Sequence, residues 1–126
     1  MPNYDSQSFT PPAPLAKVII RNPETGAELS EIPMLLDTGA DVTLLLTEGV
    51  GLLGVTISSA NQYELVGFDG SASTTNVVNV TLIFQGKTFR GQFLLIDQAW
   101  GILGRNILNS VPLFFDGPRL IWDVRK

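Results

Sequence analysis

A succession of short β-prone runs, separated by turn-forming residues, most constrains the fold of this chain. Two such runs, Ser58 to Val66 and Ser71 to Phe84, flank the glycine-bracketed segment 67–70, which predicts a β-hairpin. From Val78 to Phe84, apolar residues alternate with others at the period of a half-buried strand. Only Arg105 to Ser110 reads as helical, so the sequence predicts an all-β, barrel-like domain with one short C-terminal helix.

The remaining runs predict strands near both ends of the chain. Lys17 to Arg21 is β-prone, and Ala27 to Leu36 is expected to return as the next strand, with Pro33 at an edge or a break. Thr47 to Gly54 contains three glycines and is expected to form a loop or a weak turn. A final hairpin is expected over residues 113–124.

Length and composition indicate one folded domain with an N-terminal arm. The chain has 126 residues, of which 44% are hydrophobic and 16% charged, as in a globular domain with a modest core. Residues 1–16 differ, because they carry four prolines among small and polar residues. We therefore expect a Pro-rich extended arm over residues 1–16, left loose, and a folded domain over residues 17–126.

Charge and hydropathy exclude two classes of partner. The formal net charge is −4 and Lys and Arg form no run, so no nucleic-acid partner is expected. No apolar stretch has the length of a membrane span, and the N-terminus lacks the basic start and apolar core of a signal peptide. We expect no membrane partner and a cytoplasmic location, and we leave open that the chain is part of a longer polyprotein.

The chain contains no cysteine and no histidine. Their absence removes thiol nucleophiles, the Ser-His-Asp triad, imidazole proton shuttles and the usual zinc sites. If the protein is a hydrolase, carboxylates are the obvious acid and base groups that are left. No cofactor and no metal are expected.

Residues 37–41 (Asp-Thr-Gly-Ala-Asp) hold the leading candidate for such chemistry. Asp37 follows the apolar run 34–36, so a strand delivers a carboxylate directly before a hydroxyl and a glycine. Amide hydrolysis by carboxylates needs two of them about 3 Å apart, which share one proton because both cannot ionise at that distance. The chain offers one such loop, so the second carboxylate needs another source.

Two simpler interpretations of the same residues stay open at this point. Asp-Thr-Gly is good turn chemistry, and Asp37 then merely opens a turn. A calcium loop using Asp37 and Asp41 is disfavoured, since the required ligand series and the closing glutamate are missing.

A second cluster, 65 residues after Asp37, begins at Ile102. Residues 35–41 together with residues 101–108 (Gly-Ile-Leu-Gly-Arg-Asn-Ile-Leu) resemble the two motifs of the retroviral-type aspartic proteases, the retropepsins. The glycine-centred hairpin lies between them, where that family carries its flap. The resemblance covers Val18 to Leu108 and implies an all-β, retropepsin-like acid-protease barrel with one short C-terminal helix and a flap hairpin.

The resemblance also implies roles for the first motif. Asp37 matches the catalytic aspartate. Thr38 matches a threonine that ties together the two active-site loops of a dimer, and Gly39 matches a glycine whose backbone faces the substrate. We place these three residues in the catalytic group.

Further residues are implied to support the site or to bind substrate. Gly104 is implied to permit a tight crossing at the helix entrance, and Arg105 to form an ion pair with Asp41. The residues implied to contact substrate lie on the active-site loop, at the flap tip and before the second motif: Ala40, Asp41, Val66, Gly67, Phe68, Trp100 and Ile102. The apolar ones also have a plain interpretation as core residues.

The implied function is an aspartic endopeptidase that acts on peptide or protein substrates as a homodimer. One chain brings one Asp37, and a two-fold axis brings the second. The C-terminal segment extends past the end of compact viral proteases, as in retrotransposon, cellular and bacterial relatives, and Leu120, Trp122 and Val124 are expected at the dimer interface. The alternative is a weakly active or inactive dimeric peptide-binding scaffold of the same fold. The bond Phe9–Thr10 is a candidate for self-processing of the arm.

Overall fold

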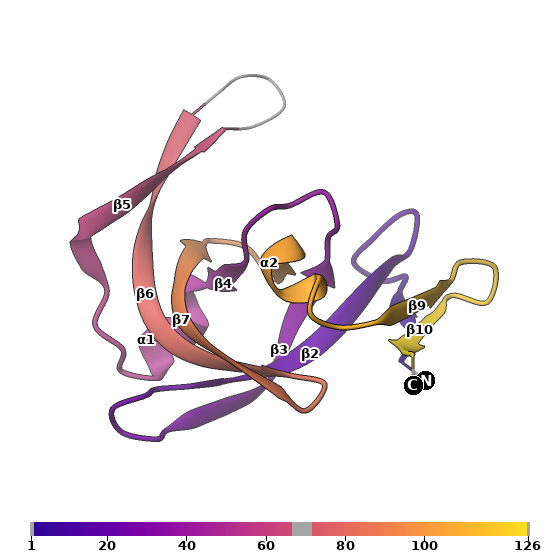
Figure 1. The fold of residues 1–126 in the computed structure, drawn as a ribbon. Helices are drawn as coiled ribbons and strands as arrows, with labels where there is room; N and C mark the ends of the chain where they lie inside the picture. The colour runs from indigo at the N-terminus through magenta and orange to yellow at the C-terminus, as the bar shows by residue number, and fades with distance from the viewer. Residues whose placement is uncertain (1, 67–71, 126) are drawn as a thin grey trace.

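The structure, a computed structural model, describes the backbone of residues 2–66 and 72–125 and the side chains outside residues 58–75 (Figure 1). Within these residues the chain forms ten strands and two short helices. The strands are β1 (Tyr4–Asp5), β2 (Ala13–Arg21), β3 (Glu28–Leu36), β4 (Leu44–Leu46), β5 (Ser58–Val66), β6 (Ala72–Phe84), β7 (Lys87–Ile96), β8 (Gly101–Leu103), β9 (Leu113–Asp116) and β10 (Ile121–Val124). The helices are α1 (Thr47–Leu52) and α2 (Arg105–Leu108). No helix among the described residues is long and apolar enough to cross a membrane.

Six strands close into a barrel in the order β2, β3, β8, β4, β7, β6, and the barrel closes because β6 also pairs with β2. Closure removes the unpaired edges that an open sheet would expose. Two further strands lie outside this ring: β1 pairs with β2, and β5 pairs with β6. The hairpin of β5 and β6 reaches away from the barrel in Figure 1. The all-β barrel predicted from the sequence is therefore confirmed.

The expected flap hairpin has the predicted strands. β5 and β6 pair antiparallel, and their last described pair is Val66 with Ala72. The intervening residues 67–71 lie outside the described part of the chain, and this gap includes the predicted tip residues Gly67 and Phe68. β6 then continues into a second antiparallel hairpin with β7, whose last pair is Phe84 with Lys87.

The barrel core also anchors the C-terminal hairpin of β9 and β10. Trp122 on β10 is only 1% exposed and belongs to the main apolar cluster. Its ring centroid lies 6.2 Å from that of Phe84 at the end of β6, and its indole Nε1–H donates to the Leu15 carbonyl oxygen at 3.3 Å. A large buried aromatic with a satisfied N–H is a strong anchor. The predicted final hairpin is thus present and fixed to the barrel.

The two sequence motifs start from neighbouring parallel strands. Met34 on β3 pairs with Gly101 on β8, and Leu36 pairs with Leu103. A side chain at position 101 would overlap the Met34 side chain and lie 2.6 Å from the Leu44 carbonyl oxygen, so glycine is required there. Since β8 pairs with β3 only from Met34 onward, Pro33 lies outside the stretch of β3 that needs partners on both sides. Asp37 and Gly104 consequently follow at the same end of the barrel.

The expected loop at 47–54 is instead largely helix α1. Val50 is fully buried in the main core cluster, and a Cβ at Gly49 would lie 3.7 Å from Ile20 Cδ1, so the helix packs tightly on β2. Burial of this face outweighs the low helix propensity of glycine. The expectation of a loop was wrong because it rested on glycine content alone.

The N-terminal arm is also more ordered than expected. β1 pairs with the first residues of β2, with Tyr4 opposite Pro14, and Asn3 forms a bridge with Ile121 on β10. Ala16 is 1% exposed and belongs to the main core cluster. The arm therefore returns along the barrel rather than staying loose, because its prolines are compatible with the short, one-sided pairing.

Candidate active site

Two backbone hydrogen bonds join the Asp37 loop to the second motif. The Asp37 N–H donates to the Leu103 carbonyl oxygen at 3.1 Å, and the Arg105 N–H donates to the Ala40 carbonyl oxygen at 2.8 Å. The first bond joins the start of the loop to the end of β8, and the second joins its other end to the start of α2. The loop that carries Asp37 is thus fixed by backbone bonds to a segment more than sixty residues away in the sequence.

The Asp37 carboxylate is held in one orientation by its own loop. Its Oδ1 accepts a hydrogen bond from the Gly39 N–H at 2.9 Å, and the Ala40 N–H donates to the Asp37 carbonyl oxygen at 3.2 Å. A Cβ at position 39 would lie 3.2 Å from Oδ1, so glycine leaves room for this approach. Asp37 itself is half-buried, whereas Thr38 and Gly39 are exposed. The carboxylate is therefore oriented by the backbone and remains accessible.

Gly104 lets the two motifs approach more closely than any side chain would allow. A Cβ there would overlap the Val42 carbonyl oxygen and lie 2.6 Å from the Val42 carbonyl carbon. Its backbone is in an extended conformation with a φ of −92°, so the requirement for glycine is one of space. The structural role predicted for Gly104 is consistent with this packing.

A buried polar bridge that sequence reasoning missed reinforces the contact. The Thr43 hydroxyl, on a residue only 1% exposed, accepts from the Gly104 N–H at 3.1 Å and donates to Asn106 Oδ1 at 2.7 Å. Buried hydroxyls need such partners, because an unpaired one is costly. A threonine within the apolar run 42–46 was the available signal, since a hydroxyl in a buried strand calls for a specific partner.

Arg105 supports the site through a different contact from the one expected. Its Nη1 donates to the Thr38 carbonyl oxygen at 2.7 Å, a short charge-assisted bond that spans the two motifs. Asp41 is exposed, and the expected ion pair of Asp41 with Arg105 is not formed. Across residues 2–57 and 76–125 the ion pairs are Lys17–Glu31, Arg21–Glu28 and Asp116–Arg119. The guanidinium is already engaged by a carbonyl, which leaves the Asp41 carboxylate in solvent.

The predicted substrate residues of the second motif lie along β8 and just before it. Ile102 is half-buried and packs against a small apolar cluster of Leu44, Val77 and Leu94, separate from the main core. Trp100 is half-buried, and its ring lies against that of Phe9, with centroids 4.5 Å apart. Both residues therefore lie outside the main barrel core, and their contact with substrate stays a prediction.

Comparison with known proteins identifies the family. The family model described as retroviral aspartyl protease matches residues 10–114. The chain belongs to the retroviral aspartyl protease family. Among solved structures, the EIAV protease in complex with the inhibitor HBY-793 matches with a TM-score of 0.57 and 28% identity, over 78% of this chain and 86% of that chain. No curated protein sequence matches the chain significantly.

The family assignment confirms the resemblance that the two motifs predicted. The matched range contains Asp37, the flap hairpin and Arg105 together, which neither motif alone would establish. It ends within β9, so the remainder of the C-terminal hairpin lies beyond the part that defines the family. The retropepsin-like barrel and its family are therefore shown, whereas the roles of individual site residues stay predictions.

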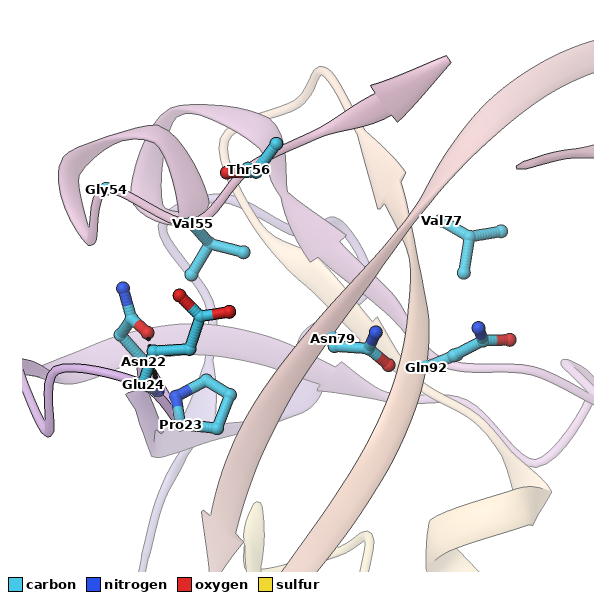
Figure 2. A pocket seen from close by; sticks show the side chains of 9 residues that line it. All are labelled: Asn22, Pro23, Glu24, Gly54, Val55, Thr56, Val77, Asn79 and Gln92. Atoms are coloured by element: carbon cyan, nitrogen blue, oxygen red, sulfur yellow. Dashed lines mark hydrogen bonds between the residues drawn. The ribbon is translucent and has the colours of Figure 1, made fainter. Parts of the chain in front are cut away.

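This member of the retroviral aspartyl protease family has several cavities among its described residues. Figure 2 shows a cavity of about 260 Å³ between the turn at Asn22, the segment after α1 and the paired strands β6 and β7. A smaller cavity of about 120 Å³ is lined by Thr43 and Asn106. Asp37 lines neither cavity.

Proposed function

We propose that the protein is an aspartic endopeptidase whose catalytic pair consists of two Asp37 carboxylates, one from each subunit of a homodimer. The observation that carries this proposal is the fixed position of Asp37, whose carboxylate accepts from the Gly39 N–H and whose own backbone N–H donates to the Leu103 carbonyl oxygen. A residue that only opened a turn would not need the further bridge from Arg105 to Thr38. The family assignment adds independent support.

The proposed chemistry follows from two carboxylates that share one proton. The ionised carboxylate accepts a proton from a water molecule, whose oxygen then attacks the peptide carbonyl carbon. The protonated carboxylate donates to the carbonyl oxygen, and a proton later reaches the leaving nitrogen. Because the pair must hold one proton, activity is expected at mildly acidic pH. No step requires a metal or a cofactor.

The C-terminal hairpin is the surface that we propose for the dimer. Phe114, Phe115 and Leu120 are large apolar residues that remain 40%, 39% and 40% exposed. Within the described residues β9 pairs with β10 alone, so its outer edge is free for another strand. An exposed apolar edge strand readily pairs with a second copy. Trp122 is buried within its own chain, so it contributes to this surface only by anchoring the hairpin.

The substrate is proposed to be an extended peptide held between the loop that carries Asp37 and the hairpin of β5 and β6. An extended chain can add to strand edges through main-chain hydrogen bonds. Apolar side chains next to the cleaved bond fit the cluster around Ile102 and Leu44. The roles of Ala40 and Val66 in contacting the peptide stay predictions, as does the cytoplasmic location.

The direct test compares Asp37→Asn with a matched control on an unstructured protein substrate at mildly acidic pH. The control is Glu24→Gln, the same exchange of carboxylate for amide at a turn beside the cavity in Figure 2. We expect the control to cleave like the unaltered protein and Asp37→Asn to lose at least about 10²–10⁴-fold in rate. Unchanged cleavage by Asp37→Asn would refute the mechanism.

The alternative is a dimeric peptide-binding domain without turnover. Peptide binding by the unaltered protein with no detectable cleavage, at any pH between mildly acidic and neutral, would favour this alternative. Measurable cleavage that Asp37→Asn abolishes would exclude it.

A further inference from the structure

The N-terminal arm places the Phe9 ring against the Trp100 ring. The two ring centroids lie 4.5 Å apart and the ring planes are tilted by 56°. This is within the range of favourable aromatic contacts. Phe9 is half-buried although it lies on a proline-flanked loop with no part in the barrel core. The contact therefore depends on Trp100, which belongs to the segment just before β8.

The loop that carries Phe9 is closed at its base and shaped by its own hydrogen bonds. Asp5 at the end of β1 pairs with Ala13 at the start of β2, so residues 6–12 form a compact loop. Asp5 Oδ1 accepts from the N–H groups of Gln7 at 2.8 Å and Ser8 at 3.0 Å, immediately before Phe9. The hydrogen bonds of the loop thus determine where Phe9 lies.

Trp100 lies within reach of a peptide bound at Asp37. It directly precedes β8, whose last residue, Leu103, accepts the hydrogen bond from the Asp37 N–H. Three residues of strand span about 10 Å, and an extended substrate advances by the same distance in about three residues. A peptide with its cleaved bond at Asp37 would therefore bring a side chain to Trp100.

We propose that Phe9 is a built-in competitor of substrate, which covers Trp100 in the free chain and is displaced by an aromatic side chain of a bound peptide. This inference rests on the proposed function, because it assigns Trp100 to the same peptide-binding site. The arm itself indicates the chemistry of the ligand: an aromatic ring on an extended or turn segment with small polar neighbours, as in Ser8-Phe9-Thr10. Release of the arm is then a condition for occupying that position.

The contact can be tested without any enzymatic activity. The chain has two tryptophans, and Trp122 is 1% exposed, so iodide quenching of fluorescence reports mainly on Trp100. We expect Phe9→Ala to increase quenching. Phe9→Tyr, which keeps the ring, and Thr10→Ala, a truncation in the same loop, should leave quenching unchanged. Equal quenching in Phe9→Ala and the unaltered protein would overturn the proposal.

The competition is tested by peptide binding to protein that carries Asp37→Asn, which does not depend on turnover. The probe is an eight-residue peptide with a phenylalanine three positions from its centre, and an otherwise identical alanine peptide is the control. Adding Phe9→Ala should lower the dissociation constant of the phenylalanine peptide about two- to tenfold, the range of one aromatic contact. The alanine peptide should bind equally with and without Phe9→Ala.

In active protein, the same change should lower KM for the phenylalanine peptide by a similar factor and leave kcat unchanged. Trp100→Ala should abolish this difference. An unchanged dissociation constant in Phe9→Ala, or an equal gain for both peptides, would contradict the competition. If no variant cleaves any peptide, the proposed function fails, while the quenching and binding results still decide the role of Phe9.

Discussion

Gly104→Ala is the change that most severely tests how the two motifs fit together. The added Cβ would overlap the Val42 carbonyl oxygen and lie 2.6 Å from its carbon and 2.9 Å from the Val42 nitrogen. All three are backbone atoms, so no side-chain rotation can relieve the overlap. The φ of −92° is accessible to alanine, so the entire penalty is steric.

The size of the penalty follows from what must move. Overpacking of this kind costs about 1–3 kcal/mol, and displacement of Val42 also strains the bond from the Gly104 N–H to Thr43, which adds about 1–2 kcal/mol. The sum of about 2–5 kcal/mol is a large part of the stability of a small domain. At about 4 °C per kcal/mol for a chain of this length, Tm should fall by about 8–20 °C.

Urea unfolding measures this loss, with Gly51→Ala as the matched control. Gly51 lies in α1, and a Cβ there would meet nothing within 4 Å. We expect the control to be as stable as the unaltered protein or more stable by up to about 1 kcal/mol, because alanine favours helix. If Gly104→Ala were as stable as Gly51→Ala, the close packing of the motifs would be refuted.

Three further changes address separate parts of the molecule. Thr43→Val should cost about 2–3 kcal/mol in urea unfolding, because the Gly104 N–H loses its acceptor, whereas Thr43→Ser should keep both bonds; equal stability of the two variants would contradict this. Phe114→Lys should shift sedimentation towards monomer and lower activity, while Leu52→Lys, at a 73% exposed position, should do neither. Backbone hydrogen bonds hold the pKa of Asp5 below its usual value. The arm loop should therefore be intact above the ordinary aspartate pKa and loosen as pH falls through the lowered pKa of Asp5. Iodide quenching of Trp100 should rise over that pH range, and quenching that does not change with pH would contradict this role of Asp5.

Local patterns in the sequence were sufficient to predict the barrel class, whereas the candidate site was proposed only with the family resemblance of the two motifs. The alternation along β6 and the turns between runs are local signals, and the structure has the expected hairpins. Asp37 and the second motif start from strands with the same apolar pattern, which proved to be parallel neighbours with Met34 opposite Gly101. The alternation, the turns and each motif taken singly depend on residues close together in the sequence, whereas the pairing of Met34 with Gly101 does not.

Features that depend on distant partners could not be predicted in the same way. α1 forms because Val50 is buried against the barrel, which glycine content does not reveal. Arg105 binds the Thr38 carbonyl rather than Asp41, and Phe9 finds Trp100 across most of the chain. A charge or a ring indicates that a partner is needed, but only the folded barrel determines which one is near.

Mixing two kinds of subunit tests the central claim that Asp37 is half of an active site. Unaltered and Asp37→Asn chains are combined in equal amounts, allowed to exchange, and assayed at a fixed total concentration that keeps the chains dimeric. If each site needs both Asp37 carboxylates, random pairing makes about one quarter of the dimers fully unaltered. The mixture should then show about one quarter of the activity of unaltered protein at the same total chain concentration. About one half of that activity would show that each chain works alone and would contradict the shared site.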